Sequence, residues 1–313
     1  MIVVVGEALV DLIVREDGTV TAVPGGGPYN VARALGRLGR SVAFVGRLST
    51  DRFGRILRAR LVADGVDVSW APTTDDPTTL AVAELDAAGA AAYQFHTVGT
   101  SAAGLVPSDL PAGLPPGTVA LHVGTLGLVL EPTATTIEGL VAAAPPDVLV
   151  MLDPNCRPSA IGDPAAYRSR LARILGRADV IKVSADDIGW LEPTLDHVRA
   201  VRTLLAGIGR SPGPGPRAAL LTDGGRPVRI VTADAVATVE VPLTDVVDTV
   251  GAGDAFGAGF LAAWTHAGHG RADFADIDAL AAATRFAVEI GRRTATRAGA
   301  EPPTNAELGW PSG

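Results

Sequence analysis

Residues 246–260 read Val-Val-Asp-Thr-Val-Gly-Ala-Gly-Asp-Ala-Phe-Gly-Ala-Gly-Phe, and this stretch organises the rest of the chain. A β-branched segment leads through Gly251 and Gly253 into a predicted helix rich in Ala, Gly and Phe. Such glycines let successive backbone N–H groups turn toward one point, and a helix N-terminus favours negative charge there. Asp254 stands beside this predicted anion site, in the first turn of the helix. The pairing of an anion site with a base suits phosphoryl transfer, although an isolated carboxylate here could simply cap the helix.

The composition predicts an acidic globular protein with a large core. The 313 residues are 47% hydrophobic and 19% charged, within the range of a single large α/β domain. The net charge is −8 and no basic run occurs, so nucleic acids and anionic membranes are not expected partners. Cys156 is the only cysteine, which excludes an internal disulfide and fits a reducing, cytoplasmic location. Neither a signal peptide nor a membrane span is predicted.

Strand and helix patterns alternate along most of the chain. We expect strands at residues 2–5, 41–46, 119–123, 148–152, 180–183, 218–222 and 228–231. This alternation predicts an α/β fold with a doubly wound parallel sheet and right-handed crossovers. Residues 211–216, rich in Pro and Gly, are predicted to be a surface loop rather than a domain linker, because the alternation resumes directly after them.

Two segments interrupt the alternation. Residues 24–28 read Pro-Gly-Gly-Gly-Pro, which predicts a flexible break before a helix at residues 30–39. Residues 66–100 carry short β-rich pieces, at 78–84 and 91–96, that are separated by turns. Such a pattern is typical of an antiparallel flap rather than of a strand–helix unit.

Several distinctive residues follow the ends of predicted strands. Asp153, Lys182, Thr222 and the turn at Gly251 all occupy such positions. In doubly wound sheets ligands bind at the carboxyl ends of the strands, so these residues are expected to line one cleft although they are far apart in sequence. Lys182 is also the only lysine of the chain, in which arginine supplies the rest of the Lys and Arg total.

Two of these stretches resemble the signatures of the PfkB (ribokinase-like) carbohydrate kinases. The residues Asp-Thr-Val-Gly-Ala-Gly-Asp-Ala-Phe at 248–256 are similar to the C-terminal signature of that family, and Gly-Gly-Gly-Pro-Tyr-Asn at 25–30 resembles the N-terminal one. The resemblance extends from residue 6 to residue 300. It implies a three-layer α/β/α fold with a mostly parallel sheet and a small β-rich lid. Gly-Glu-Ala-Leu-Val-Asp at 6–11 and Lys-Val-Ser at 182–184 look most like fructokinase members.

The resemblance implies catalytic roles at the C-terminal signature. Asp254 matches the catalytic base of the family, and the backbone of Gly251, Ala252 and Gly253 matches the group that stabilises the transferring phosphoryl group. Arg157 follows another predicted strand and is the candidate for further stabilisation of phosphoryl charge. Taken alone, the segment around Arg157 would be read as a turn, because Pro and Asn are turn formers.

The N-terminal signature implies a sugar site. Asp11, Gly26, Gly27 and Asn30 match residues that hold the sugar, with Asp11 as an ionised acceptor of hydrogen bonds from hydroxyl groups. The alternative is an exposed carboxylate at a strand edge, followed by a loop whose Asn caps a helix. Because Gly27 and Tyr29 differ from the residues more usual at these positions, an altered sugar pocket is expected.

The resemblance implies that residues 182–187 and 222–224 bind the nucleotide. Lys182, Ser184 and Asp187 match an element that orders Mg²⁺ and phosphate, and Thr222 and Gly224 match one that contacts ATP. Asp187 is one methylene shorter than the usual Glu, which leaves its link to the metal open. Alternatively, Ser184 caps a helix and the Thr222 segment is a tight turn between two strands.

A further loop resembles the site of a monovalent cation in this family. Asp248, Thr249 and Gly299 are its candidate residues, and K⁺ is the candidate ion. Carbonyl and carboxylate oxygens are the ligands that suit such a hard cation. ATP and Mg²⁺ are the other cofactors that the resemblance implies.

Together these observations predict one ribokinase-like domain over residues 1–313, with lid segments at about 9–24 and 66–105. The predicted activity is transfer of the ATP γ-phosphate to a primary hydroxyl of a small sugar, with fructose as the first candidate. A 2-keto-3-deoxygluconate kinase, a nucleoside kinase and a catalytically inactive sugar-binding regulator are the alternatives. Relatives often pair through the lid, so a homodimer is expected.

Overall fold

The computed structural model describes residues 1–85, 91–110, 113–207 and 215–311. Its centre is an eight-stranded sheet in the order β14-β13-β12-β11-β10-β9-β1-β4. The six strands from β12 to β4 run parallel, and β13 and β14 extend one edge as antiparallel strands. The expectation of a mostly parallel sheet is therefore confirmed. The strands are β1 Ile2–Val5, β4 Val42–Val45, β9 Ala120–Gly124, β10 Leu149–Asp153, β11 Val180–Ser184, β12 Ala218–Asp223, β13 Arg226–Thr232 and β14 Val236–Val239.

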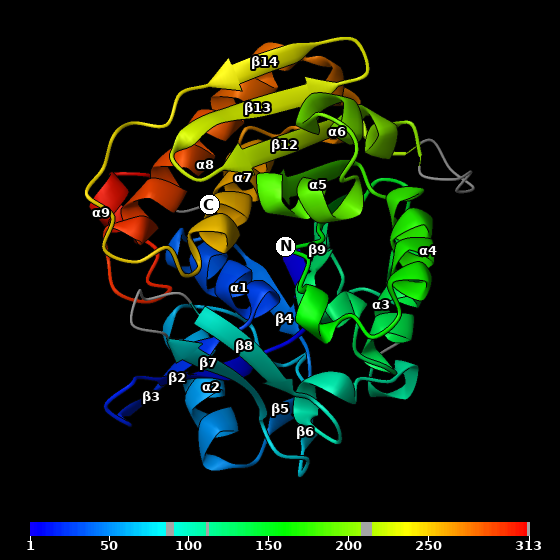
Figure 1. Cartoon of the computed structure of the whole chain (residues 1–313). Coiled ribbons are helices and arrows are strands. Elements are labelled where there is room, and N and C mark those ends of the chain that lie inside the picture. Colours follow the sequence, from blue (N-terminus) through cyan, green and yellow to red (C-terminus); the bar gives the residue numbers. More distant parts are fainter. Residues whose placement is uncertain (86–90, 111–112, 208–214, 312–313) are drawn as a thin grey trace.

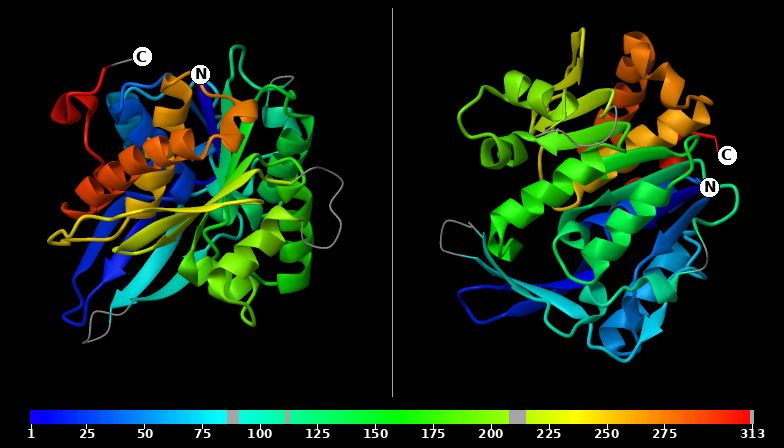
Figure 2. Two further views of the ribbon diagram at one scale, coloured as in Figure 1. Left: turned by 90° about the horizontal axis from the view of Figure 1, so that it is seen from above. Right: turned by 90° about the vertical axis from the view of Figure 1, so that its right-hand side faces the viewer.

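Helices cover both faces of this sheet because alternate strand residues supply two separate hydrophobic cores. Val4 belongs to one core with α1, α2, α7 and α8, whereas Val5 belongs to the other with α3–α6. The result is three α/β/α layers (Figures 1 and 2). The helices are α1 Gly27–Arg37, α2 Arg52–Ala63, α3 Thr133–Ala143, α4 Pro164–Leu175, α5 Ala185–Leu191, α6 His197–Leu205, α7 Ala252–His266, α8 Ile277–Ala295 and α9 Asn305–Leu308. Short 3₁₀ helices lie at Ser101–Ala103, Pro107–Asp109, Thr125–Leu128, Pro158–Ala160 and Arg271–Ala275.

The order of the strands fixes where a ligand can bind. β1 lies between β4 and β9, so the chain builds outward from β1 in one direction and then returns past it to build the other side. Such a reversal leaves a crevice at the carboxyl ends of the parallel strands. The segments that follow β1, β9, β10, β11 and β12 therefore converge at one edge of the sheet.

A smaller four-stranded sheet, in the order β3-β2-β7-β8, stands apart from the main one (Figure 1). Its strands lie in the segments expected to form a lid, although residues 86–90 fall outside the described ranges. The expected antiparallel flap is only partly correct, because β2 and β7 pair in parallel between two antiparallel pairs. Its strands are β2 Leu9–Val14, β3 Val20–Gly25, β7 Thr79–Leu85 and β8 Ala91–His96, and a two-stranded pair joins β5 Leu48–Ser49 to β6 Thr73–Thr74.

The predicted flexible break at residues 24–28 is wrong. Gly25 ends β3, and α1 begins at Gly27, three residues earlier than expected. Pro28 fits the first turn of a helix, where a backbone N–H needs no intrahelical partner. Gly26 is the N-cap residue, so Asn30 does not cap the helix but lies inside it. Residues 211–214 of the predicted surface loop lie outside the described residues.

The helices that the structure describes include none that is long and apolar enough to cross a bilayer.

The N-cap residue Asp51 connects α2 to the smaller sheet, and this connection gives a testable prediction. Its carboxylate accepts hydrogen bonds from Gly54 N at 2.7 Å and from the backbone and hydroxyl of buried Thr78 at 2.7 and 2.6 Å. Asp51→Ala removes the cap and leaves Thr78 without these partners, so we expect the free energy of unfolding to fall by about 2–3 kcal/mol. Asp163 only caps α4, and Asp163→Ala is expected to cost about 1 kcal/mol. Equal losses in denaturant unfolding would contradict this interpretation.

Candidate active site

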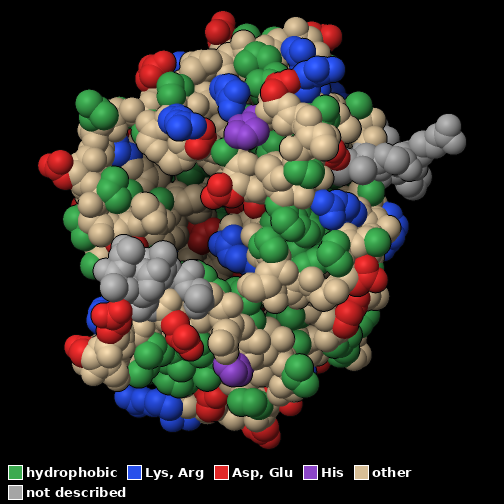
Figure 3. All heavy atoms as spheres, in the orientation of Figure 1, with side chains coloured by type: hydrophobic (Ala, Val, Ile, Leu, Met, Phe, Trp, Pro, Cys, Tyr) green, Lys and Arg blue, Asp and Glu red, His purple; other side chains and the backbone are tan. Residues whose placement is uncertain are grey.

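A cavity of about 570 Å³ lies at the carboxyl ends of the parallel strands, between the main sheet and the smaller one. Figure 3 shows a hollow in the middle of this face, with acidic and basic side chains at its mouth. Most of the residues predicted from sequence for a site reach it, together with several that were not predicted. Its lining includes Glu7, Asp11, Gly26, Gly27, Asn30, Tyr93, Phe95, Thr125, Asn155, Cys156, Arg157, Lys182, Ser184, Asp186, Asp187, Thr222, Thr249, Gly251, Gly253 and Asp254.

The N-terminus of α7 forms the floor of this cavity and has the conformation expected of an anion site. Gly251 is the N-cap residue, with φ 73°, a left-handed conformation that favours glycine. A Cβ atom on Gly251 would lie 2.4 Å from the Cβ of Ala300, so the position also has no room for a side chain. Ala252 starts the helix, and its N–H donates to the carbonyl oxygen of Thr249 at 3.2 Å. The N–H groups that follow in this first turn have no intrahelical partner, so they favour an anion placed at the helix end.

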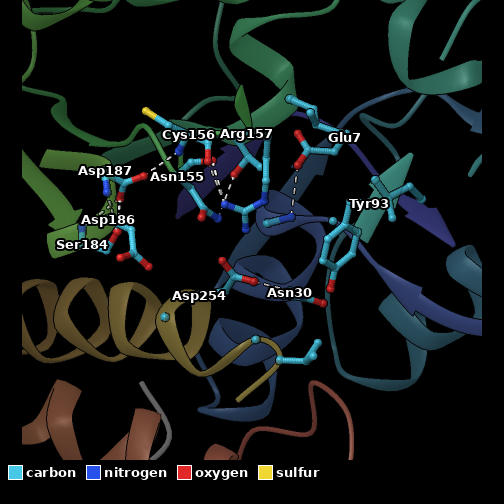
Figure 4. Close-up of a pocket in the computed structure, with 18 of the residues that line it drawn as sticks. Glu7, Asn30, Tyr93, Asn155, Cys156, Arg157, Ser184, Asp186, Asp187 and Asp254 are labelled. Carbon is cyan, nitrogen blue, oxygen red and sulfur yellow. Dashed lines mark hydrogen bonds between the residues drawn. The ribbon is translucent and has the colours of Figure 1, made fainter. Parts of the chain in front are cut away.

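Asp254 lies in the same turn, with 8% of its surface exposed. Its Oδ2 accepts a hydrogen bond of 2.8 Å from Asn30 Nδ2 on α1 (Figure 4). Burial raises the pKa of Asp254, and the hydrogen bond from Asn30 and the positive charges of Lys182 and Arg157 oppose that rise. A buried carboxylate with a raised pKa is suited to accept a proton.

Arg157 supplies a positive charge on the other side of the cavity. It follows β10, and its Nη1 donates to the carbonyl oxygens of Asn155 and Cys156 at 3.2 and 3.1 Å, which holds the guanidinium over its own loop. The positive charge of Arg157 opposes the rise in pKa that burial causes at both Asp11 and Asp254. Arg157 is therefore close enough to act on these two of the carboxylates that line the cavity, as Figure 4 shows for Asp254.

The residues predicted to hold a sugar lie together at this cavity. Asp11 projects from β2, and its carboxylate fits only because Gly25 has no side chain, since a Cβ there would lie 2.2 Å from Oδ2. Burial raises the pKa of Asp11 to about 6, against the opposing charge of Arg157. The expectation that Tyr29 alters the pocket is wrong, because Tyr29 is fully buried in the hydrophobic core of α1.

Glu7 is a functional candidate that was not predicted. It follows β1, is completely buried, and accepts hydrogen bonds from Gly27 N at 3.1 Å and Gly127 N at 2.9 Å. Burial raises its pKa to about 8, although the backbone N–H donors offset part of that rise. Glu7 thereby fixes the first residue of α1 beside the cavity. A carboxylate directly after a buried strand was the available signal in the sequence.

Thr125 and Asn155 are the two non-glycine residues with positive φ among those described, at 54° and 40°. Both line the cavity, and Asn155 Nδ2 donates to Thr125 Oγ1 at 3.4 Å. A Cβ on Gly27 would lie 2.3 Å from that hydroxyl, so the glycine makes room for it. Backbone strain of this kind concentrates at binding sites, but nothing in the sequence around Thr125 predicts it.

The residues predicted for the nucleotide occupy the ends of β11 and β12. Lys182, Ser184, Asp187 and Thr222 line the cavity, whereas Gly224 lies in the turn between β12 and β13, beyond the lining. Both oxygens of Asp187 are already engaged, by Cys156 N at 2.6 Å and by the backbone and hydroxyl of Ser184 at 2.8 and 2.7 Å. Ser184 thus caps α5 as the sequence suggested, and with Asp187 it forms a capping box, which was not predicted.

The predicted cation loop is held by one carboxylate. Asp248 accepts hydrogen bonds from Val250 N at 3.0 Å and Gly299 N at 2.8 Å, so it joins the loop before α7 to the loop after α8. Thr249 lies at the rim of the cavity. Each carboxylate oxygen of Asp248 accepts one hydrogen bond and keeps a further lone pair, so the carboxylate as well as carbonyl oxygens of this loop are available to a cation.

An aromatic pair on β8 forms the wall that the smaller sheet contributes. The rings of Tyr93 and Phe95 stack with centroids 6.1 Å apart and planes at 13°, and both residues line the cavity. The sequence placed them in the flap but did not single them out. Flat apolar faces at this position favour a ligand that has a ring.

A base beside an anion site, in the crevice of a doubly wound sheet, is the arrangement of a phosphotransferase. The family model for pfkB family carbohydrate kinases matches residues 1–306. The chain belongs to the pfkB family of carbohydrate kinases, and its reaction is phosphoryl transfer to an alcohol group. The family predicted from the two sequence signatures is confirmed.

Individual relatives agree with this assignment. The chain is 35% identical over 266 residues to a fructokinase of Rhizobium leguminosarum bv. trifolii, covering 84% of this chain and 79% of the relative. It is similar to the structure of Vibrio cholerae O395 fructokinase with fructose, ADP and calcium bound, with 26% identity, TM-score 0.84 and coverage of 98% and 97%. It is similar as well to Salmonella enterica aminoimidazole riboside kinase complexed with its riboside and an ATP analogue, with 27% identity, TM-score 0.82 and coverage of 96% and 94%.

The conformation of Gly251 predicts a selective effect of substitution on activity. Gly251→Ala combines an unfavourable φ with a clash against Ala300, so the loop before α7 must shift. We expect the turnover number to fall by about 10²-fold, the magnitude typical of a displaced oxyanion-stabilising donor.

Gly268 provides a matched control, because its φ of 76° is similar but no atom lies within 4 Å of an added Cβ. Gly268→Ala is expected to lower stability by less, because it has the φ strain without the clash, and to leave turnover unchanged. Equal turnover in the two variants would refute the assignment.

Proposed function

We propose that the protein is an ATP-dependent sugar kinase that phosphorylates a primary hydroxyl group, with fructose as the first candidate acceptor. The observation that carries this proposal is the position of Asp254. Its carboxylate is hydrogen-bonded to Asn30 and lies beside the glycine turn at Gly251, in a cavity that Asp11 and Arg157 also line. A proton acceptor, an anion site and acceptors for sugar hydroxyls thus share one space.

In the proposed reaction the acceptor hydroxyl oxygen attacks the γ-phosphorus of ATP. A bond forms between these atoms, the bond from the γ-phosphorus to the β–γ bridging oxygen breaks, and ADP leaves. Asp254 accepts the hydroxyl proton, for which its buried position and raised pKa suit it. The N–H groups of the Gly251–Gly253 turn and the guanidinium of Arg157 stabilise the charge on the transferring group.

The nucleotide is proposed to lie over the ends of β11 and β12. Lys182, Ser184 and Thr222 line that part of the cavity, and Gly224 lies in the adjacent turn. Mg²⁺ would neutralise phosphate charge when bound with ATP. Because the oxygens of Asp187 are engaged within the protein, Asp187 fits a role that orders the loop or acts on the metal through water. K⁺ would be held by carbonyl oxygens of the loop at Asp248, Thr249 and Gly299.

We further propose that residues 1–313 act as one catalytic domain whose smaller sheet is a lid. The lid strands β2 and β8 bring Asp11 and Tyr93 to the cavity, so closure of this sheet would exclude water from the reaction. A homodimer formed through the lid and a cytoplasmic location are parts of the same proposal. The acidic net charge of −8 gives no reason to expect nucleic acid as a partner.

Two similarities support fructose as the acceptor of this chain. One is to the fructokinase of Rhizobium leguminosarum bv. trifolii, and the other is to the fructose-bound structure of Vibrio cholerae fructokinase. A riboside is the second candidate, because the stacked Tyr93 and Phe95 could pack on a planar base and because the Salmonella enterica relative binds a riboside. 2-Keto-3-deoxygluconate is a third. A sugar-binding regulator without activity would have no use for a buried base at an anion site.

One panel tests the proposal. ATP consumption is measured with fructose, ribose, 2-keto-3-deoxygluconate and adenosine, for the wild-type protein and for Asp254→Asn. We expect turnover with fructose to be fastest, and we expect the variant to lose it while ATP still binds, because an amide cannot accept the proton. Near-normal turnover of Asp254→Asn would overturn the mechanism. Absence of turnover with every acceptor would favour the regulator.

The raised pKa of Asp11 predicts how the affinity for the acceptor depends on pH. Its pKa of about 6 lies above the ordinary value, so the carboxylate is ionised and accepts hydrogen bonds fully only above pH 6. We expect the affinity for the acceptor, measured by calorimetry with ADP present and without turnover, to fall as the pH drops through about 6. Asp11→Asn is always neutral, and its weaker binding should be independent of pH in this range. An unchanged pH dependence in Asp11→Asn would remove Asp11 from the sugar site.

A further inference from the structure

Arg33 is a buried cation that the proposed reaction does not involve. It lies on α1, three residues after Asn30, and only 3% of its surface is exposed. A guanidinium that leaves water loses its hydration, and this loss is offset only where its donors find well-placed acceptors. The positions of these acceptors therefore show which parts of the protein Arg33 holds together.

The donors of Arg33 reach two other segments of the chain. Nε donates to Asp64 Oδ2 at 2.6 Å, directly after α2, and Nη2 donates to both carboxylate oxygens of Glu301 at 3.2 Å. Nη1 donates to the backbone carbonyl oxygen of Ala300 at 3.0 Å. Attraction between opposite charges accounts for the contacts with the two carboxylates. The contact with Ala300 is different, because it fixes the backbone of the segment that follows α8.

Ala300 is the residue that packs against the glycine turn at the start of α7. A Cβ on Gly251 would lie 2.4 Å from the Cβ of Ala300, 3.0 Å from its Cα and 3.6 Å from Asn30 Nδ2. Ala300 is itself buried, with 5% of its surface exposed. Ala300 and Asn30 thus both bound the space beside Gly251, so a movement of either residue would free the turn to shift.

Helix α1 therefore reaches the start of α7 by two contacts. Asn30 and Arg33 are three residues apart, so their side chains lie on the same face of α1. Asn30 donates directly to the carboxylate of Asp254 at 2.8 Å. Arg33 acts through Ala300 on Gly251, the N-cap residue of α7. One helix thus positions both the proposed base and the proposed anion site, and the rate of transfer depends on how these two groups are placed relative to each other.

We propose that Arg33 is a positioning residue for phosphoryl transfer, which holds Ala300 against Gly251 and so keeps the Gly251–Gly253 turn aligned with the carboxylate of Asp254. The inference rests on the proposed kinase function and adds to it a residue that lies outside the lining of the cavity. Without this contact the turn can shift, and a displacement of about 1 Å at a reacting centre can lower a rate by about 10²-fold.

Arg37, one turn further along α1, provides a matched control. Its Nη1 lies 3.1 Å from Asp64 Oδ1, and its Nε donates to the carbonyl oxygen of Pro302 at 2.6 Å. Arg37 thus joins α1 to the same two segments, but it holds the second one at Pro302 rather than at Ala300. A general loosening of α1 would follow from the loss of either arginine, whereas displacement of Ala300 follows from the loss of Arg33.

The variant Arg33→Met removes the contact without leaving either carboxylate unpaired. Asp64 keeps its ion pair with Arg37, and Glu301 keeps its ion pair with Arg60 at 3.3 Å. Methionine also retains much of the apolar stem of arginine. We therefore expect the variant to fold, with a reduced free energy of unfolding, and activities are compared at a temperature below the unfolding transition of every variant.

Steady-state kinetics give the first measurement. We expect Arg33→Met to lower the turnover number by at least about tenfold and to change KM for ATP and for the acceptor by less than about twofold, because both substrates still bind while the turn is displaced. Arg37→Met should keep the turnover number within about twofold of the wild type.

A second measurement responds to the glycine turn itself. Calorimetry compares the affinity for ADP with aluminium fluoride, which imitates the transferring phosphoryl group, with the affinity for ADP alone. Arg33→Met should lower this ratio of affinities by about tenfold, and Arg37→Met should leave it within about twofold. Ala300→Gly keeps the carbonyl oxygen that Arg33 holds but lacks the methyl group that packs against Gly251, so it should lower the ratio as well. This variant decides the question if Arg33→Met does not fold.

The outcomes separate this assignment from the proposed function. If the wild-type protein turns over, an unchanged ratio in Arg33→Met, or in Ala300→Gly where the first variant does not fold, overturns the role of Arg33 alone. Equal losses in Arg33→Met and Arg37→Met overturn it too, because they indicate a general loosening of α1. A wild-type protein that turns over none of the acceptors overturns the proposed function and this assignment together.

Discussion

The active site depends on keeping the buried carboxylate of Asp254 beside the N-terminus of α7, the positive end of the helix dipole. Asp254 is almost enclosed, and its charge would be costly there without the hydrogen bond from Asn30 and the nearby charges of Lys182 and Arg157. These compensating groups come from α1, from β11 and from the loop after β10, which are far apart in sequence. The fold brings them to one place because the carboxyl ends of parallel strands share an edge of the sheet.

Glycines make this arrangement sterically feasible. Gly251 gives the turn before α7 its left-handed backbone, Gly253 leaves room for the ammonium of Lys182, and Gly27 leaves room for the hydroxyl of Thr125. Gly253 and Gly27 therefore let a polar side chain come closer than a residue with a Cβ atom would, and Gly251 lets the backbone itself turn. The same close packing makes the site sensitive to single methyl groups, since interiors have little free volume to absorb them.

The sequence predicted the main sheet and most of the candidate site well, because both depend on local signals. Buried β-branched runs mark β1 and β11, and the glycine turn marks the start of α7. Features that depend on tertiary contacts were not predicted. At the early start of α1, the carboxylate of Glu7 accepts the N–H of Gly27 from another segment, a contact that adds to the local preference of Pro28 for a first helical turn. The parallel pairing of β2 with β7, and the strained backbone of Thr125, likewise have no local signature.

The central claim is that the Asp254 carboxylate and the N–H groups at the start of α7 converge on one γ-phosphoryl position. A crystal structure with ADP, a planar aluminium fluoride and a bound acceptor sugar measures this directly. The account predicts the fluoride within hydrogen-bonding distance of the N–H groups of the Gly251–Gly253 turn, and the acceptor hydroxyl about 2.6–3.2 Å from an oxygen of Asp254. A fluoride bound away from this turn, or a hydroxyl that does not reach Asp254, would contradict it.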